Sequence, residues 1–264
     1  MKKGYGDFMI KKNWTRYSIV LLSICLLGFF SCKKAVEESP KPLRIAVASN
    51  FMPVMETIKE LYLNSLTEVV EVDLINGASG ILKQQISQGA PFDLFFSADT
   101  LYPFELYQAG FAKQKPQTYA IGKMVLVSNR PIQALDQMCM DSSWSKFGIA
   151  NPALAPYGAE AQRFIRTLAC ADDIQQKLVL ANNINQLNHF SQNEHVAYAL
   201  TSANVLYQDE LTVFFYPLPD SFGPIQSCML LDGQQDSHAS AKDFLEFVQS
   251  EEIQALIVSK GYRM

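Results

Sequence analysis

The sequence predicts an α/β protein of two lobes, each with a mixed, mostly parallel β-sheet flanked by helices. Three observations predict this fold class. Short apolar runs alternate with amphipathic stretches over residues 43–110, and the alternation begins again after residues 124–129. A last apolar run over residues 225–231 then precedes a final helical stretch. With 264 residues, 48% of them hydrophobic, the chain has room for one large or two small domains and lacks the composition of a disordered protein.

The first block opens with LRIAVAS (residues 43–49), an apolar run typical of a buried strand. Ser49 and Asn50 can cap the helix that follows, and Pro53 is tolerated in its first turn. Apolar residues of this helix recur at helical spacing, at Met52, Met55, Ile58 and Tyr62. The remaining elements expected in this block are a strand over 69–75, a short helix over 80–88, a strand over 92–98 and a helix that Asp99 can cap and that ends near Gly110.

The second block follows MVLVSN (residues 124–129) and begins with FGIAN (residues 147–151), a run typical of a strand. A turn and a helix over about 159–169 come next. The further elements expected are helical stretches over 173–180 and 184–190, a strand over 196–200, a helix over 202–207 and a strand over 212–218. Three prolines and a glycine in PLPDSFGP then break the pattern, before a strand over 225–231 and a long helix over 240–260.

Two blocks followed by a returning strand imply that the chain crosses between the lobes twice. We expect these crossings near Gly122–Lys123 and near Pro219–Gly223. One lobe is then expected to contain residues 43–122 together with 222–264, and the other residues 123–221.

The amino terminus predicts export. Five basic residues precede an apolar run over residues 17–31, which is too short to cross a bilayer comfortably as a permanent helix and is typical of a secretory signal. The run ends in FFSC, which resembles a bacterial lipobox, so we expect a lipoprotein signal peptide over residues 1–31 and acylation of Cys32. An ordinary signal peptide and an uncleaved anchor helix are the alternatives. Residues 32–42 are expected to form a tether that holds the protein outside the cytoplasm, in the periplasm or its equivalent, on a bacterial membrane.

The net charge of the chain disfavours some binding partners, and its cysteines and histidines limit the possible disulfides and metal sites. Without residues 1–31 the chain has 17 basic and 25 acidic residues, a net charge of about −8, which disfavours nucleic acid as a partner. Any anion must then be bound by local geometry against the field of the whole protein. Export permits one disulfide among Cys139, Cys170 and Cys228, and the sequence leaves its pairing open. The three histidines show no ligand spacing, so no metal ion with direct protein ligands is expected.

Three loops carry the candidate binding groups. Ser49 and Ser79 both follow predicted strands, at the edge of the sheet where ligands bind in folds of this kind. The loop GASG (residues 77–80) opens a helix but lacks the lysine of a P-loop. In NPALAPYG (residues 151–158) a proline and a glycine precede a helix whose first amides, near Tyr157, are free to donate to an anion. The alternative interpretations are a plain N-cap for each serine and an ordinary proline–glycine turn.

Motifs of catalysis and of cofactor binding are absent from the sequence. It contains no Gly-x-Ser-x-Gly elbow, no GxGxxG loop and no Walker lysine. An enzyme with Ser79 as nucleophile or Asp99 as acid–base is the alternative from another class, but no base can be named beside the serine. We therefore expect a binding protein with no catalytic residues and no cofactor.

Together these loops resemble a known family, the periplasmic molybdate-binding proteins of ABC transporters. NGASGILKQQISQGAPFDLFFSAD (residues 76–99) is similar to the family's most characteristic block, AVASNF to its first ligand segment, NPALAPYG to its third, and YPLPDSFGPI to its return crossing. The resemblance covers about residues 43–262. It implies a two-lobed periplasmic-binding-protein type II fold with the ligand cleft between the lobes. It also implies a monomer that captures molybdate or tungstate and delivers it to the permease of an ABC importer.

The same resemblance implies which residues bind the oxyanion. The family's contacts fall on Ser49 and Ser79 through hydroxyl and amide, and on Tyr157 and Ile184 through their amides. Some relatives add the residue after the first serine, here Asn50, and a tyrosine hydroxyl in the segment that matches VAYALTSAN. The aligned position there is Leu200, and Tyr198, two residues earlier, is the candidate for this contact. The molybdenum or tungsten is then held only through its oxygens. Neutral donors can match all four oxygens of a fully ionised dianion, while helix amino termini spread the compensating charge.

Competing hypotheses remain at this point. Taken alone, Ile184 and Tyr198 are also typical of core residues. Within the binding class, the main alternative is a protein for another oxyanion or a small organic anion. The effector domain of a transcription regulator is a further alternative, but it conflicts with the export signal.

Overall fold

The computed structural model describes residues 41–131, 133–207, 213–232 and 238–264. The expected signal segment, Cys32 and the tether up to residue 40 lie outside the described residues. None of the described helices is long and apolar enough to cross a membrane. The described part holds two five-stranded sheets within one unit, residues 40–264.

The first sheet has the strand order β2-β1-β3-β10-β4. Its strands are β1 (Leu43–Ala48), β2 (Val72–Gly77), β3 (Leu94–Ser97), β4 (Gln117–Ile121) and β10 (Ile225–Leu230). The strands β1, β2 and β3 are parallel, whereas β10 runs antiparallel to both β3 and β4. Most residues of β1, β3 and β10 are buried, as expected for strands covered on both faces.

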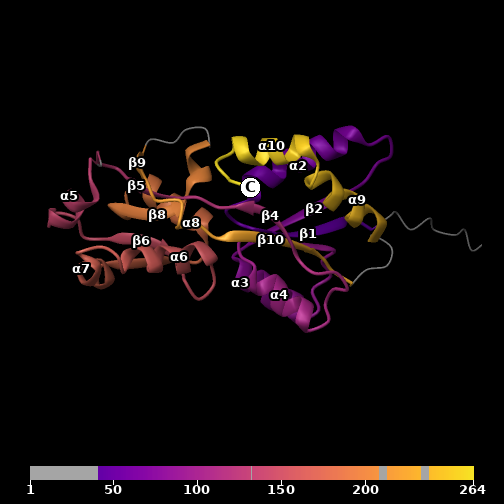
Figure 1. The fold of residues 1–264 in the computed structure, drawn as a ribbon, viewed down its shortest axis with the longest axis horizontal. Coiled ribbons are helices and arrows are strands. Elements are labelled where there is room, and N and C mark those ends of the chain that lie inside the picture. The colour runs from indigo at the N-terminus through magenta and orange to yellow at the C-terminus, as the bar shows by residue number, and fades with distance from the viewer. Residues whose placement is uncertain (1–40, 132, 208–212, 233–237) are drawn as a thin grey trace, which may run out of the picture. The chain divides into compact units, whose positions relative to one another are not determined.

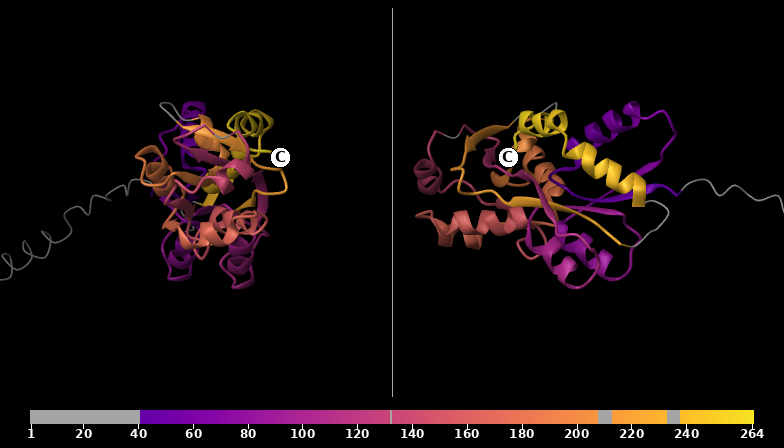
Figure 2. Two further views of the ribbon diagram at one scale, coloured as in Figure 1. Left: turned by 90° about the vertical axis from the view of Figure 1, so that its left-hand side faces the viewer. Right: turned by 45° about the vertical axis from the view of Figure 1, so that its right-hand side comes forward.

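Five helices cover this sheet. They are α2 (Met52–Ser65), α3 (Ser79–Ser87), α4 (Leu101–Gln108), α9 (His238–Val248) and α10 (Glu251–Ser259). Figures 1 and 2 show α2, α9 and α10 on one face of the sheet and α3 and α4 on the other. In β1, Ile45 and Val47 belong to the apolar cluster on the first face, while Ala46 packs with Leu82 and Leu106 on the second. This alternation is the two-residue period of a strand.

The second sheet has the order β7-β6-β8-β5-β9. Its strands are β5 (Met124–Ser128), β6 (Phe147–Ala150), β7 (Leu178–Ala181), β8 (Tyr198–Ser202) and β9 (Phe214–Pro217). β6 is parallel to β7 and β8, and β5 is antiparallel to β8 and β9. The helices of this half are α5 (Leu135–Met140), α6 (Pro156–Ile165), α7 (Ala171–Gln176), α8 (Ile184–Gln192) and the short 3₁₀ helix η1 (Ala203–Tyr207). Two mixed sheets flanked by helices confirm the expected fold class.

The chain passes between the two sheets twice. β4 of the first sheet leads into β5 of the second, and β9 leads back into β10. The two connections lie side by side, because the amide of Gly122 donates to the carbonyl oxygen of Pro224 at 2.9 Å. Gly223 has a φ of +152°, and a Cβ there would lie 2.1 Å from the carbonyl oxygen of Gly122, so this approach requires glycine. The carboxyl-terminal residues reach the same place, since Ile121 and Arg263 exchange two backbone hydrogen bonds.

Two expected helices differ from the structure, and two further elements were not expected. The long helix expected over residues 240–260 is two helices, α9 and α10, because Ser250 between them has an extended backbone. The helix expected over 173–180 is also wrong: α7 ends at Gln176, and β7 begins at Leu178. Pairing of β7 with β6 overrides the local helical tendency there. The strand β4 and the helix α5 are not anticipated by the pattern of the sequence.

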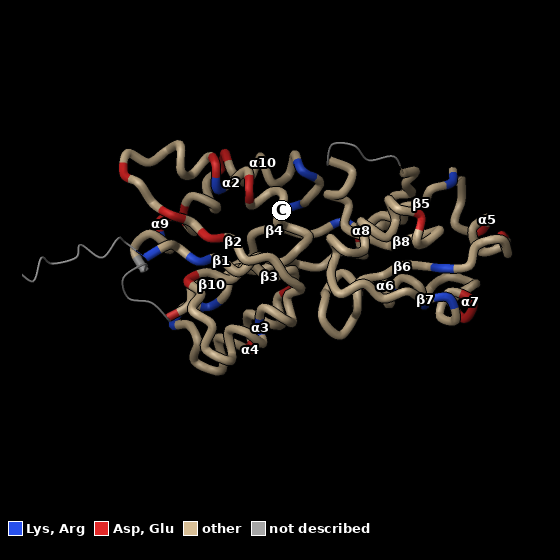
Figure 3. The backbone as a smooth tube through the Cα atoms, turned by 180° about the vertical axis from the view of Figure 1, so that it is seen from behind, with Lys and Arg blue, Asp and Glu red and all other residues tan. Residues whose placement is uncertain are grey.

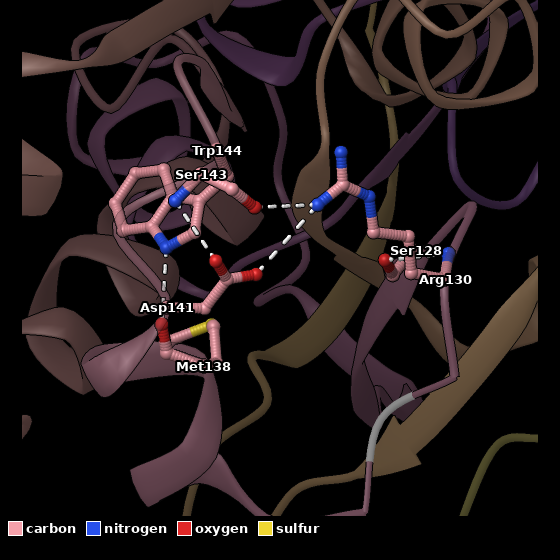
Figure 4. Close-up of polar contacts among 6 residues, drawn as sticks. All are labelled: Ser128, Arg130, Met138, Asp141, Ser143 and Trp144. Atoms are coloured by element: carbon pink, nitrogen blue, oxygen red, sulfur yellow. Dashed lines mark hydrogen bonds and ion pairs between the residues drawn. The ribbon is translucent and has the colours of Figure 1, made fainter.

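A disulfide ties together the outer end of the second half. It joins Cys139 of α5 to Cys170, whose Cα atoms are 5.3 Å apart, whereas Cys228 is a buried free thiol. Near it, the guanidinium of Arg130 pairs with the carboxylate of Asp141 at 3.6 Å (Figure 4). The pairing that the sequence leaves open is thereby assigned. Disulfides persist in oxidising compartments, which agrees with an exported protein.

Candidate functional site

A small cavity lies between the two sheets, at the carboxyl ends of their parallel strands. The space there that protein atoms do not fill is about 200 Å³, counted together with open solvent at its mouth. Its walls come from the loops that follow β1, β2, β3, β6 and β7. The residues that line it are Ala48, Ser49, Asn50, Ala78, Ser79, Ala98, Ala155, Pro156, Tyr157, Asn183 and Ile184.

Ser79 is the first residue of α3, and its side chain makes no capping bond to that helix. Its Oγ instead accepts a hydrogen bond from the amide of Ala98 at 3.0 Å. Because a hydroxyl has one donor and two acceptor positions, its hydrogen remains available to a ligand. The amide of Ser79, at the first position of the helix, has no acceptor within the helix either. The interpretation of Ser79 as a plain N-cap is therefore wrong.

Ser49 carries the most informative side chain in the cavity wall. It is 3% exposed, and its Oγ has no hydrogen-bond partner among the described residues. Neither Ser49 nor Asn50 caps α2, because the N-cap of that helix is Phe51, without a side-chain bond. The amide of Ser49 already donates to the carbonyl oxygen of Gly77 at 3.0 Å, which leaves the hydroxyl for a ligand. A buried unpaired hydroxyl costs about 1–3 kcal/mol, so this group points to a bound partner.

Helix α6 begins at the cavity from the opposite half. Pro156 is accommodated in its first turn, and the amide of Tyr157 lies immediately after it. Gly158 allows the helix to start directly against the end of β6, because a Cβ there would lie 2.1 Å from the carbonyl oxygen of Ala150. Because Gly158 has no side chain, the first turn of α6 can lie close to the end of β6 and so line the cavity.

Helix α8 begins at the same cavity. The side chain of Asn183 caps it by accepting from the amide of Gln186 at 2.9 Å. The amide of Ile184, at the first position of α8, then has no acceptor within the helix. Three helix amino termini, those of α3, α6 and α8, therefore meet at the cavity, and each brings partial positive charge.

The walls of the cavity are neutral. Among the described residues that line it, none is an Asp, Glu, Lys, Arg or His. Burial raises the pKa of the Tyr157 phenol above its ordinary value, so this group stays uncharged at neutral pH. The described residues contain no cluster of three side chains able to hold a metal ion. Figure 3 shows acidic and basic positions interspersed over both halves.

Two further residues expected at the site behave differently from the rest. Asn50 lines the cavity, but its amide nitrogen donates to Gln226 Oε1 at 3.0 Å and to the Tyr262 hydroxyl at 3.1 Å. Tyr198 does not line it. It lies at the opposite end of β8 and packs against Trp144, with ring centroids 6.0 Å apart, next to the contacts of Figure 4. The structure thus brings Ser49, Asn50, Ser79, Tyr157 and Ile184 together, and leaves Tyr198 in the core of the second half.

The structure adds Asn183 and Ala98 to the residues that sequence reasoning identified. Asn183 had a usable signal, since an asparagine before a helical pattern predicts an N-cap. Ala98, whose amide orients the hydroxyl of Ser79, had none. Asp99, the acid–base residue of the enzyme alternative, is not in the wall, and its carboxylate accepts from the Ser97 hydroxyl at 2.8 Å.

The two halves touch beside the cavity. The amide of Gly80 in α3 donates to the carbonyl oxygen of Leu154 at 2.9 Å. A Cβ on Gly80 would lie 3.0 Å from the same oxygen, so glycine permits this close approach. The hydroxyl of Tyr102 also donates to the carbonyl oxygen of Ala153 at 3.4 Å. These contacts define a closed arrangement of the two halves.

Two lobes joined by two adjacent connections, with a neutral donor-lined cavity between them, define a solute-binding protein of the two-lobed type. The chain belongs to the family of bacterial extracellular solute-binding proteins, whose sequence model matches residues 43–263. Members of this family act outside the cytoplasm.

Within this family, the chain is similar to proteins that are named for the oxyanion they bind. The chain is 30% identical over 221 residues to the molybdate-binding protein ModA of Rhodobacter capsulatus, covering 82% of this chain and 86% of the relative. The solved structure of the Azotobacter vinelandii periplasmic molybdate-binding protein matches with a TM-score of 0.77 and 26% identity, over 84% of this chain and 99% of that one. The sulfate-binding protein SubI of Mycobacterium tuberculosis shares the fold, with a TM-score of 0.64 and 14% identity over 84% of this chain and 86% of that one. These relatives are binding proteins and not enzymes, in agreement with the sequence.

Proposed function

We propose that this protein captures molybdate outside the cytoplasm and delivers it to the permease of an ABC importer. The observation that carries the proposal is the buried, unpartnered hydroxyl of Ser49 in a neutral cavity where three helices begin. The names of the Rhodobacter and Azotobacter relatives support molybdate as the ligand. The proposal extends to tungstate, a tetrahedral dianion of nearly equal size.

The chemistry of the wall favours a fully ionised oxyanion. The hydroxyls of Ser49 and Ser79, with the amides of Ser79, Tyr157 and Ile184, are donors that the ligand oxygens accept. Each hydrogen bond to a charged partner contributes roughly 1.5–3 kcal/mol. Donors that the fold already holds in place lose little entropy on binding. A protonated anion such as hydrogen phosphate would leave its own hydrogen without an acceptor, and a smaller anion such as sulfate would leave wall donors unpaired.

Capture requires the two halves to separate and close. The proposed lobes are residues 43–122 with 222–264, and residues 123–221, turning about the two adjacent connections. We also propose that Cys32 carries a lipid that anchors the mature chain as a monomer, which would keep it near its permease. Support for the anchor comes from the FFSC sequence that ends the apolar run.

Thermal unfolding with and without ligand tests the proposal. The purified protein, freed of carried-over ligand by unfolding and refolding, is heated with saturating molybdate, tungstate, sulfate or phosphate. A ligand at a hundred times its dissociation constant adds about 2.7 kcal/mol, which corresponds to roughly 5–10 °C for a chain of this size. We expect this shift with molybdate and tungstate only. A shift with sulfate, phosphate or a small organic anion alone would contradict the proposed ligand.

Binding is expected to be nearly independent of pH. Tyr157 is the titratable residue of the wall, and burial raises its pKa, so its phenol remains neutral from pH 6 to pH 9. Molybdate is fully ionised over the same range. Isothermal titration at pH 6, 7.5 and 9 should give dissociation constants that agree within about twofold. A tenfold change across this range would mean that a titrating side chain takes part in binding.

A further inference from the structure

Tyr157 belongs to both halves of the protein. Its backbone lies in the cavity wall at the start of α6, in the second half. Its phenol reaches the first half, where the hydroxyl accepts a hydrogen bond from Gln226 Nε2 at 3.0 Å. Gly122, in the connection between β4 and β5, makes room for it, since a Cβ there would lie 2.2 Å from this hydroxyl.

Gln226 is the centre of this buried cluster. It lies in β10, is 0% exposed, and uses both ends of its amide. Its Oε1 accepts from Asn50 Nδ2 at 3.0 Å and from the Tyr119 hydroxyl at 2.8 Å. Its Nε2 donates across to Tyr157. One side chain thus connects two cavity residues that come from different halves, Asn50 and Tyr157.

A second link runs beside the first. The side-chain amide of Asn204 in η1 donates to the carbonyl oxygen of Asn50, which also accepts from the hydroxyl of Tyr262 at 2.9 Å. Asn50 therefore receives hydrogen bonds from both halves. All these groups are neutral and buried, so their hydrogen bonds are strong when made and costly when one partner moves away.

We propose that Gln226 is a positioning residue, and that its hydrogen bond to Tyr157 holds the closed arrangement and so sets how long the ligand stays bound. This inference rests on the proposed function. Opening separates Tyr157 from Gln226 or pulls the phenol out of its site, and either change leaves the buried amide unpaired. The same phenol is attached to the turn whose amide faces the ligand. The free energy needed to separate the two halves is thus linked to the ligand cavity through Tyr157.

A pair of tyrosines provides a matched comparison. Tyr157→Phe removes one hydrogen bond that crosses between the halves, the bond from Gln226. Tyr119→Phe removes hydrogen bonds to the same Gln226 and to the carbonyl oxygen of Ser97, both within the first half. Gln226→Met keeps the approximate shape of the side chain and removes both of these hydrogen bonds, together with the one that Gln226 accepts from Asn50. Because Gln226→Met also loses contacts within its own half, a double-mutant cycle of Tyr157→Phe with Gln226→Met isolates the crossing bond.

Two measurements are made on each variant: the dissociation rate of molybdate by stopped flow, and the radius of gyration of the ligand-free protein by small-angle scattering. We expect Tyr157→Phe and Gln226→Met each to speed dissociation by about tenfold, and the double variant to be no faster than the faster single one. Ligand-free Tyr157→Phe is expected to be more expanded than the wild type. Tyr119→Phe is expected to lower the unfolding temperature while changing the dissociation rate less than twofold.

The outcomes separate the two proposals. If Tyr157→Phe matches the wild type in both dissociation rate and radius of gyration, or if Tyr119→Phe changes both as much, the role of Gln226 is overturned. If the wild type binds none of the four oxyanions, the proposed function fails. The scattering of ligand-free protein then still decides whether the Tyr157–Gln226 bond holds the closed arrangement.

Discussion

Replacing the two cavity serines together, Ser49→Ala with Ser79→Ala, is expected to weaken molybdate binding by about 10²–10⁴-fold. On the proposed function each hydroxyl would supply one hydrogen bond to a charged ligand, worth roughly 1.5–3 kcal/mol. Isothermal titration measures the loss directly. Ser87→Ala is the matched control, because Ser87 lies on α3 as well, but its hydroxyl is exposed and bonds to Lys83.

The two single variants should differ in stability. Ser49→Ala removes a buried hydroxyl that has no partner, so the unfolding temperature of the ligand-free protein should stay the same or rise. Ser79→Ala instead leaves the amide of Ala98 without its acceptor and should lower that temperature. Unchanged molybdate affinity in the double variant would place the binding site elsewhere.

Removing the disulfide is expected to cost about 2–5 kcal/mol of stability without changing affinity. Cys139→Ser with Cys170→Ser opens a link between residues 31 positions apart, neither of which lines the cavity. Cys139 belongs to α5 and Cys170 precedes α7, two helices at the outer end of the second half (Figure 1). The expected fall in unfolding temperature is about 5–15 °C. Calorimetry with and without a reductant provides the control, because the reductant should destabilise the wild type and leave the double variant unchanged. A loss of molybdate affinity larger than about twofold would contradict the separation of this link from the site.

Much of this architecture was accessible from the sequence, because its elements have simple periodic patterns. Strands buried on both faces are continuous apolar runs, and the helices between them have one apolar face. Such patterns locate β1 and β10 and the loops that carry Ser49 and Ser79. These patterns fail where contacts with neighbouring elements decide the secondary structure. β7 is a strand because β6 lies beside it, and the helical pattern over residues 240–260 did not predict the extended backbone of Ser250.

The residues of the site fall into the same two groups: some are predicted by local sequence, and others depend on contacts between distant residues. A serine after a strand is a local signal, and so is a proline before the first turn of a helix. The environment of Gln226 is not, because its bond to Asn50 joins residues 176 positions apart. Tyr198 shows the limit of the family resemblance. The resemblance places a tyrosine contact in this segment with Leu200 at the aligned position, whereas strand pairing sets Tyr198 opposite Ser128, at the end of β8 away from the cavity.

The end of the chain bears on how this protein can be turned into a tool. The guanidinium of Arg263 donates to the carbonyl oxygen of Asp220 at 2.7 Å, and its backbone pairs with Ile121. The carboxyl-terminal residues therefore contact both connections between the two sheets. A reporter group fused after Met264 would be attached directly beside these two connections. If the proposed opening and ligand binding hold, a fluorescent group at this position would report the motion of the two halves without contacting the cavity, which suits it to an oxyanion sensor.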